Sequence, residues 1–391
     1  MKSHILHIKQ GRVIDPANGM DEVKDIFVTN GKITSNLHEA PDMEINASGL
    51  WVVPGLIDMH VHLRDPGQLH KETLQSGAAA AAAGGFATVC CMPNTSPVID
   101  NVATINYIRA TASKITVLPI GSISVGLEGK EISPMREMKE AGICAISDDG
   151  KTLADSVLFK EAMRQAKELD LPILVHCEEE VEIIERDISL ARQTGAKLHI
   201  CHVSTARGVE LIRAAQKAGL DVTAEAAPHH FTLTQDDHER DPNFKMSPPL
   251  RTAADRAAII EGLRDGTIGV IATDHAPHSE AEKAVDYELA PNGIIGLETA
   301  LAIAYTELVC VHKILTPSEL IKKFTVNPAE ILGLDTGHLG VGAAANITII
   351  NPNEAYAINK NTFKSLSRNT PFHGREVVGQ VVCTIANGKI V

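Results

Sequence analysis

Two histidines in one short segment are the first residues whose types and spacing could do chemistry. In the segment DMHVHLR, residues 58–64, polar and apolar side chains alternate. Side chains alternate across a β-strand, so His60 and His62 would share one face and could hold one metal ion between them. Asp58 and Arg64 would lie on the same face. A half-buried strand with two alternating imidazoles would look the same, so this pair alone leaves both interpretations open.

Further candidate ligands follow other apolar runs of the β type. They are Asp148 and Asp149, His176 with Glu178, His202, and Asp274 with His275. The carboxyl ends of parallel strands in a closed barrel meet at one rim, where active sites of such barrels lie. Imidazole nitrogens and carboxylate oxygens together suit Zn²⁺, and a shared carboxylate would let two ions sit side by side. Because ionisable groups are rarely buried without partners, the joint pattern favours a metal site over coincidence.

The elements that must position these residues alternate between short apolar runs and helical patterns. We count eight β-type runs: residues 56–62, 86–92, 115–120, 143–147, 172–176, 198–202, 222–226 and 268–273. Between them, residues 72–83, 155–169 and 253–263 have helical patterns, often ended by Gly. Eight repeats of a βα unit predict an α/β fold, a (β/α)8 barrel of the TIM type.

Both ends of the chain have a different pattern, of short strands joined by turn residues. DIFVTNGKI lies near the start and VVCTIANGKIV at the finish, and each contains Asn-Gly, a strong two-residue hairpin signal. Neither end supplies enough strands for an independent sheet. We therefore predict that residues 1–52 and 340–391 pair into one small β domain, with the barrel, residues 53–339, inserted between them.

Composition limits the classes of partner. The 391 residues contain 36 Lys plus Arg against 49 Asp plus Glu, and a net charge of −13 repels nucleic-acid backbones and anionic membranes. Seven Cys without a C-x-x-C pair favour reduced thiols over a disulfide framework. The start, MKSHILHIKQGRVIDP, lacks the apolar run of a signal peptide, and no run is long enough to cross a bilayer. These features predict a cytoplasmic protein.

A series of motifs, in chain order, resembles one enzyme family. The motifs are PGLIDMHVHLRDPG, MPNTSP, SDDG, HCE, HVST, SPPLR, ATDHAPH and GIIGLETAL. Together they resemble those of the dihydroorotases of the long bacterial type, within the amidohydrolase superfamily. The match extends from about Pro54 to Leu301, and the flanking β segments are also similar. It is more specific than the H-x-H pair, which the whole superfamily shares.

Carried over position by position, the resemblance implies a metal centre with one or two zinc ions. The implied ligands are His60, His62, Asp149, His176 and His202, with Asp274 beside the metal. Asp149 would bridge two ions at the position where hydantoinases and allantoinases usually have a carboxylated Lys. Asp274 would be the catalytic acid/base, taking a proton from the attacking water and returning it to the leaving nitrogen. Taken alone, Asp274 could equally be a capping residue.

The resemblance also implies substrate contacts. Arg64 and Asn94 would hold a substrate carboxylate, a task that suits a planar guanidinium, and His62 and His278 would also touch the substrate. Without the resemblance, Asn94 after a Pro would be interpreted as a turn residue.

Three features depart from the family pattern. Ser247 stands where many relatives have Asn, and Asn292-Gly293 where they often have Phe-Gly, so substrate contacts at these positions could differ. Between HCE and HVST, relatives usually have about two dozen more residues than this chain, whose connection has the ordinary length of an α/β unit.

The function implied by the resemblance is the reversible interconversion of N-carbamoyl-L-aspartate and L-dihydroorotate in pyrimidine synthesis. Two alternatives stay open: a hydantoinase or allantoinase acting on another cyclic amide, and a non-catalytic barrel that only scaffolds aspartate transcarbamoylase. Such scaffolds lack the metal-ligand residues, all of which are present here. We expect a small-molecule substrate and a homodimer, with association to aspartate transcarbamoylase as a further option.

Overall fold

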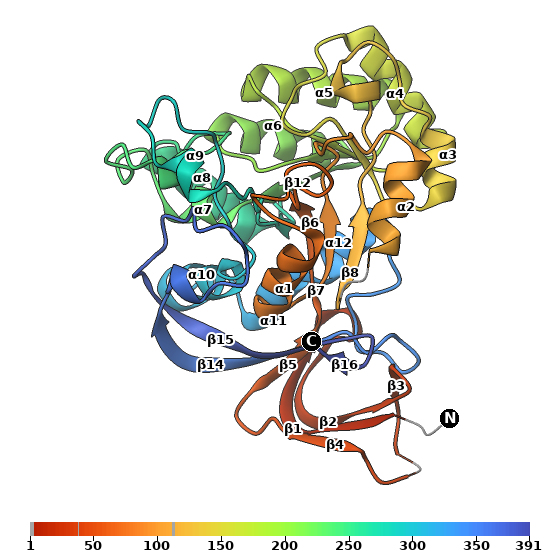
Figure 1. The fold of residues 1–391 in the computed structure, drawn as a ribbon, viewed down its shortest axis with the longest axis vertical. Coiled ribbons are helices and arrows are strands. Elements are labelled where there is room, and N and C mark those ends of the chain that lie inside the picture. The colour runs from red at the N-terminus through yellow and green to blue at the C-terminus, as the bar shows by residue number, and fades with distance from the viewer. Residues whose placement is uncertain (1–3, 38, 112–113) are drawn as a thin grey trace.

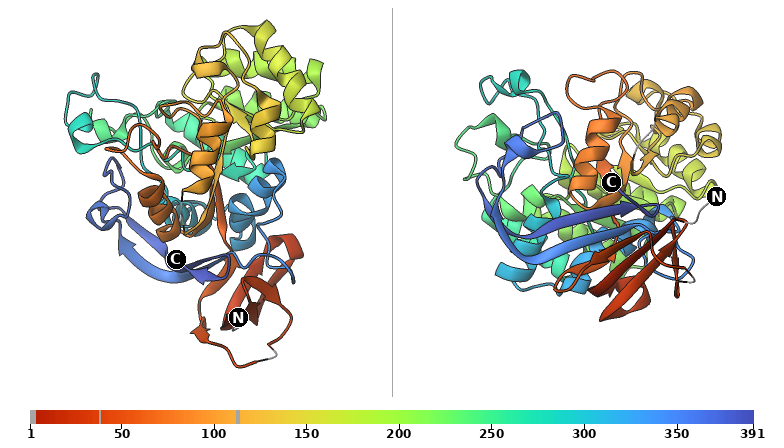
Figure 2. Two further views of the ribbon diagram at one scale, coloured as in Figure 1. Left: turned by 45° about the vertical axis from the view of Figure 1, so that its right-hand side comes forward. Right: turned by 60° about the horizontal axis from the view of Figure 1, so that its bottom comes forward.

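The computed structural model describes residues 4–37, 39–111 and 114–391. A helix-covered barrel forms one end of the molecule, and a sheet made from both ends of the chain forms the other (Figure 1). The two views of Figure 2 show the same division, with the first strands and the last strands side by side. The predicted fold class, a TIM-type barrel with a small sheet from both chain ends, is confirmed.

All eight predicted barrel strands are present and parallel. They are β6 (Leu56–Val61), β7 (Phe86–Cys91), β8 (Thr116–Pro119), β9 (Ile146–Ser147), β10 (Ile173–Val175), β11 (Leu198–Ile200), β12 (Val222–Ala226) and β13 (Val270–Ile271). Regular pairing joins β6, β7 and β8 in that order into one group, and β9, β10, β11, β12 and β13 into a second group. Single parallel bridges, Gly121 to Ile146 and Val61 to His275, close the ring between these two groups.

Helices alternate with these strands along the chain. They are α1 (Leu74–Ala83), α2 (Val102–Ala110), α3 (Met135–Ala141), α4 (Ser156–Glu168), α5 (Glu180–Thr194), α6 (Ala206–Lys217), α7 (Pro228–Thr232), α8 (Ala253–Asp265), α9 (Glu280–Lys283), α10 (Ala300–Ala304), α11 (Pro317–Phe324) and α12 (Val326–Leu332). The helices predicted over 72–83, 155–169 and 253–263 correspond to α1, α4 and α8. Their starts are set by side-chain caps, because Thr73, Asp155 and Thr252 each accept a hydrogen bond from the first helical turn.

The second sheet follows the order β16-β15-β14-β5-β1-β2-β3, with β4 also paired to β1. Its strands are β1 (Ile5–Asp15), β2 (Met20–Thr29), β3 (Lys32–Thr34), β4 (Met43–Asn46), β5 (Trp51–Pro54), β14 (Ile347–Ala357), β15 (Glu376–Ala386) and β16 (Lys389–Ile390). Both predicted Asn-Gly hairpins are present, with Asn30 and Asn387 in the left-handed region that such turns require. The predicted boundary at residue 52 falls inside β5, which leads directly into the barrel.

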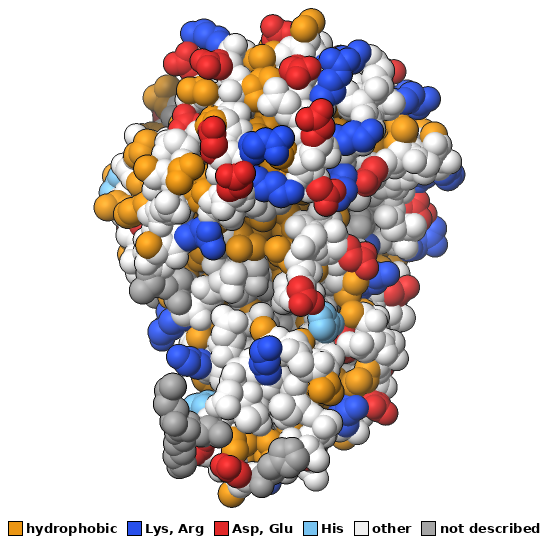
Figure 3. All heavy atoms as spheres, turned by 90° about the vertical axis from the view of Figure 1, so that its right-hand side faces the viewer, with side chains coloured by type: hydrophobic (Ala, Val, Ile, Leu, Met, Phe, Trp, Pro, Cys, Tyr) orange, Lys and Arg blue, Asp and Glu red, His pale blue; other side chains and the backbone are white. Residues whose placement is uncertain are grey.

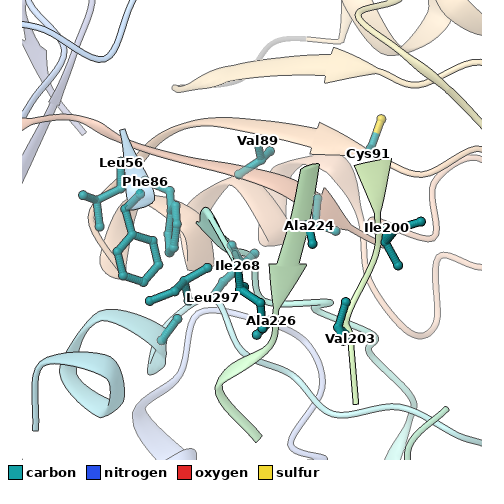
Figure 4. Packing of buried hydrophobic residues seen from close by; sticks show 14 of the residues in the cluster. Leu56, Phe86, Val89, Cys91, Ile200, Val203, Ala224, Ala226, Ile268 and Leu297 are labelled. Carbon is teal, nitrogen blue, oxygen red and sulfur yellow. The ribbon is translucent and has the colours of Figure 1, made fainter. Parts of the chain in front are cut away.

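Apolar side chains inside and around the barrel form the main core. Figure 4 shows part of it, where Leu56 and Phe86 at the start of two strands lie near Ile268 and Leu297. A second apolar cluster, which includes Ile8, Val28, Val52 and Ile349, lies in the terminal sheet. Helix α11 packs against both β1 and β6, so it lies between the sheet and the barrel. The fold therefore holds the strand ends on a rigid scaffold.

Two further findings bear on the expected partners. None of the helices in the described part of the chain has the length and apolar character needed to cross a membrane. On the face in Figure 3, acidic and basic side chains are interspersed and form no single basic patch.

Candidate metal centre and active site

Six predicted side chains meet at the carboxyl ends of the barrel strands. They are His60, His62, Asp149, His176, His202 and Asp274. All six are buried. His60 lies on β6 and His62 follows it, while the other four come after β9, β10, β11 and β13. Residues from five places in the sequence are thus brought together because parallel strands end at one rim.

The six ligand atoms fall into two neighbouring groups of three. One candidate group contains His60, His62 and Asp274, and the other contains Asp149, His176 and His202. Within each group the atoms lie within 4.8 Å of one another. This spacing leaves room for a cation at the centre of each group.

Asp149 lies between the two groups. Its Oδ2 is 3.3 Å from Nε2 of His62, and its Oδ1 is 3.3 Å from Nε2 of His60. The same Oδ1 is 3.7 Å from both Nδ1 of His176 and Nε2 of His202. One carboxylate thus contacts imidazoles of both groups, which is the position that a bridging ligand would take.

Asp274 is close to the first group. Its Oδ1 lies 3.1 Å from Nε2 of His62 and 3.5 Å from Nε2 of His60. Burial disfavours the Asp274 carboxylate, but the charge of His60 and the hydrogen bond of His62 outweigh this and lower its pKa to about 2. Asp274 is therefore ionised near neutral pH, as a base must be.

Several polar atoms of the centre have no hydrogen-bond partner among the described residues. They are Nε2 of His60, Oδ1 of Asp149 and Nδ1 of His202. Buried polar atoms without partners are costly, and they are rare unless a water molecule or an ion completes them. In addition, Nδ1 of His176 faces Nε2 of His202 at 2.9 Å. Unpaired nitrogens and carboxylate oxygens that face a shared space fit a divalent cation.

The charges of the centre lead to the same conclusion. Burial opposes protonation of His60, but Asp149 and Glu225 outweigh it and raise the pKa of His60 well above its ordinary value. The Asp149 carboxyl is also disfavoured by burial, yet neighbouring His60 brings its pKa well below the usual range. The buried carboxylates therefore stabilise positive charge in this space, and a metal ion would supply it.

A second layer of side chains orients the imidazoles. Nδ1 of His60 lies 2.6 Å from Oε1 of Glu225, whose Oε2 is 3.1 Å from Nε2 of His199. Nδ1 of His62 lies 2.9 Å from Oδ1 of Asn94. Both partners accept from Nδ1 and so direct Nε2 toward the centre, as second-layer partners of metal ligands commonly do. Asp148, also a candidate ligand from the sequence, lies outside the ligand groups: its carboxylate accepts from the Ser124 backbone N–H and hydroxyl.

Glu225 and His199 were not predicted from the sequence. Glu225 is a buried carboxylate on β12, a strand whose other residues are small or apolar apart from one Thr. An acidic residue in such a strand was the available signal. Cys201 is a buried core residue that also belongs to a candidate group with His60 and Asp149. Burial raises the pKa of its thiol beyond the usual range, so the thiol stays protonated.

A pocket of about 330 Å³ opens above the centre. The predicted substrate contacts that line it are His62, Arg64, Asn94, Ser247, His278 and Asn292. Gly293 is not among the lining residues; it lies behind the pocket, where a Cβ would come within 2.5 Å of the Ala276 carbonyl oxygen. Only a glycine fits such a close approach.

Three site residues adopt backbone conformations that are unusual for side chains with a Cβ. Arg64, His202 and Asp274 have φ values of 57°, 33° and 47°. Such conformations cost free energy and persist only where the surrounding structure enforces them. The scaffold is therefore strained at three positions that face the pocket or the candidate metal centre.

Comparison with known proteins places this site in a family. A model of the amidohydrolase family matches residues 51–391. The dihydroorotase of Pelotomaculum thermopropionicum is 47% identical, over 99% of this chain and 98% of the relative. The dihydroorotase of Clostridioides difficile is 45% identical, over 98% of this chain and 99% of the relative.

The chain belongs to the dihydroorotase family of amidohydrolases. The family and the ligand groups together identify a metal-dependent hydrolase. Among solved structures, the L-hydantoinase of Arthrobacter aurescens has a TM-score of 0.90 and 26% identity, over 99% of this chain and 95% of that one. The same barrel and sheet thus occur in a protein that is named for another activity.

The alignment with the Pelotomaculum thermopropionicum relative also shows a difference in length. It spans 419 positions, 28 more than the 391 residues of this chain, so at least 28 positions of the alignment have no counterpart here. Residues 176–179 alone join β10 to α5. This chain is therefore shorter than the relative within the matched region, and its own connection after His176 is short.

Proposed function

We propose that this member of the dihydroorotase family catalyses the reversible interconversion of N-carbamoyl-L-aspartate and L-dihydroorotate. The observation that carries the proposal is Asp149, a carboxylate between the two ligand groups, where the hydantoinase pattern has a carboxylated Lys. The identity of 43–47% to dihydroorotases over nearly the whole chain supports the same substrate. Hydrolysis opens the cyclic amide, and the reverse reaction closes it in pyrimidine synthesis.

We propose zinc as the metal, with one or two ions per chain: His60, His62 and Asp274 would hold one ion, and Asp149, His176 and His202 would hold a second. The donor set of imidazole nitrogens and carboxylate oxygens suits Zn²⁺. When bound, the metal polarises the ring carbonyl and activates a water molecule.

The residues of the chain have separate tasks in this proposal. Asp274 accepts a proton from the attacking water and returns it to the ring nitrogen as the amide bond breaks. Arg64 is half-buried, and its Nε donates to the Pro277 carbonyl oxygen at 3.3 Å, so its terminal nitrogens remain for the substrate carboxylate. Asn94 touches both His62 and the Asp149 backbone, and so contributes to the metal centre as well as the pocket.

The pocket wall holds the rest of the ring. His278 donates through Nε2 to the Asn292 carbonyl oxygen at 2.8 Å, and this bond fixes the imidazole at the wall of the pocket. Ser247 and Asn292 line the same pocket and would contact the substrate, with Gly293 directly behind them. This arrangement excludes bulk water from one side of the reacting amide.

Domain organisation, assembly and location form the remaining part of the proposal. We assign residues 1–52 and 340–391 to the β domain and 53–339 to the catalytic barrel, because the terminal sheet draws its strands from both ends. We also propose a cytoplasmic homodimer, able to associate with aspartate transcarbamoylase. All seven Cys are free, which supports a reducing compartment.

A direct test is ring opening of three substrates by the purified zinc-loaded protein, followed by absorbance. We expect turnover of L-dihydroorotate and little turnover of a hydantoin or of allantoin. Turnover of a hydantoin or allantoin without turnover of dihydroorotate would contradict the proposal and favour the second candidate, a hydantoinase. Metal binding with no turnover of any of the three would favour the scaffold.

A further inference from the structure

A short segment of the C-terminal chain end lies against the pocket of the barrel. Residues 365–369 follow the turn after β14, yet Ser365 donates through Oγ to the buried carboxylate of Glu72. Ser367 donates through Oγ to the Lys71 carbonyl oxygen at 2.8 Å. These bonds attach the segment to the loop between β6 and α1. The chain end therefore reaches the rim where the metal centre lies.

Asn369 ends this segment and is only 3% exposed. Its Nδ2 donates to the carbonyl oxygens of Ala276 and Gly293, both at 2.9 Å. Its Oδ1 accepts from the backbone N–H of His278 at 3.1 Å. Its own carbonyl oxygen accepts from the Ile295 N–H at 3.0 Å. One buried amide thus bonds to two loops that are 15 or more residues apart in sequence.

These two loops carry proposed substrate contacts. The first contains Asp274 and His278, and the second contains Asn292 and Gly293. They approach so closely that a Cβ on Gly293 would lie 2.6 Å from the His278 ring. The two loops are joined directly by His278 Nε2, which donates to the Asn292 carbonyl oxygen at 2.8 Å, and by the Ala276 N–H, which donates to the Ile294 carbonyl oxygen at 2.9 Å. The Asn369 amide adds bonds from a third segment to the same two loops.

The chemistry of the bonds makes Asn369 hard to replace. A primary amide has two N–H donors and one carbonyl acceptor, and here both kinds are used at once. An Asp side chain would keep the acceptor for His278 but would place oxygen against two carbonyl oxygens. Because the site is buried, water has no ready access to repair those contacts.

We propose that Asn369 is a positioning residue for substrate binding: it fixes the His278 loop against the Asn292 loop, although it belongs to the part of the chain that forms the terminal sheet. It acts through these loops and does not itself line the 330 Å³ pocket. The inference rests on the proposed function for the identity of the substrate. The ordering of the two loops by Asn369 does not depend on the proposed function.

The test uses the full-length zinc-loaded protein with the substitutions Asn369→Asp and Asn369→Ala. We expect the KM for L-dihydroorotate to rise by about tenfold while kcat falls by less than about threefold, because uniform binding is lost and the metal centre is kept. Zinc content should equal that of the wild type. Hydrogen–deuterium exchange of residues 275–279 and 292–296 should become faster in both variants.

The matched control is Asn346→Asp. Asn346 is also a buried Asn, 7% exposed, but its amide accepts from the Asn387 N–H at 2.8 Å and donates to Thr336, within the terminal sheet region. Its loss should lower the melting temperature without changing KM or the exchange of the two loops.

Three outcomes decide the matter. If both KM and the hydrogen–deuterium exchange of the two loops are unchanged in the Asn369 variants, the inference is overturned. An equal rise of KM in Asn346→Asp would also overturn it, since the effect would then follow general destabilisation. If the wild type fails to turn over dihydroorotate, the proposed function is wrong, while the exchange measurement still tests the positioning role in either direction.

Discussion

The rim of the barrel and the terminal sheet both bury their residues, but they bury different kinds of atoms. At the rim, Nε2 of His60, Oδ1 of Asp149 and Nδ1 of His202 are buried without a hydrogen-bond partner among the described residues. In the sheet, the buried side chains are mainly aliphatic, such as Ile8, Val28 and Ile349, and they pack against one another. The sheet thus contributes folding stability, whereas the rim keeps polar atoms unpaired for a ligand.

This difference means that substitutions in the two regions should affect different measurements. Rim variants should lose metal or turnover with little change in the free energy of unfolding. Sheet variants should lose stability with little change in turnover. Asn369 is the exception, because it belongs to the chain end of the sheet and bonds to the loops of the rim.

The largest effect is expected from removing metal ligands. His60→Ala and His62→Ala each delete an imidazole of the same group, so the double variant should lose the zinc held by that group and nearly all turnover. Metal analysis of the purified protein measures this. His70→Ala is the control, because the His70 side chain is 62% exposed and outside the ligand groups. Full zinc content in the double variant would contradict the site.

The next effect concerns proton transfer. Asp274→Asn keeps the shape of the side chain but removes the base, so kcat should fall by at least ~10²-fold with the fold intact. Steady-state kinetics in both directions check this, with Asp335→Asn, at a fully exposed position, as the control. A near-normal kcat in both directions would exclude Asp274 as the proton shuttle.

In the terminal sheet, the effect should be on stability alone. Ile349→Ala removes a fully buried side chain from β14 and should lower the free energy of unfolding by about 2–5 kcal/mol. Urea unfolding measures the loss, and kinetics of the remaining folded protein should show normal kcat and KM. Val382→Ala on β15, at a 53% exposed position, should change neither. A large drop in kcat for Ile349→Ala would show that the two regions are not separable.

The smallest effect depends on pH, at the junction of the barrel with the sheet. Burial raises the pKa of Glu298 from 4.5 to about 7, although N–H groups of Lys364 and Ser365 oppose this. Between these two pH values the folded protein binds more protons than the unfolded chain, so the contribution of Glu298 to stability falls as pH rises. Glu298→Gln cannot ionise. The difference in melting temperature, variant minus wild type, should therefore increase by about 2–4 °C when the pH is raised from 4.5 to 8. A difference that does not change with pH would refute this.

Much of the barrel rim and of the terminal sheet could be predicted from the sequence, because these features depend on local patterns of residues. Alternating apolar runs and helical segments predicted all eight barrel strands, and Asn-Gly predicted both hairpins. The spacing of His60 and His62 placed them on one strand face. The positions of Asp149, His176, His202 and Asp274 after strands predicted that they would meet at the rim. Each inference needed only strand periodicity and the parallel order of the barrel.

Other features required the tertiary structure, because they depend on contacts between segments far apart in the chain. Glu225 lies 165 residues from His60, and its role in orienting that imidazole follows from a 2.6 Å contact that no local pattern encodes. Asn369 lies 91 residues from His278. The chain itself therefore determined which side chains end each strand. Only the closing of the barrel and the return of the C-terminal segment decided which atoms those side chains contact, since hydrogen bonds depend on distance in space and not on separation along the sequence.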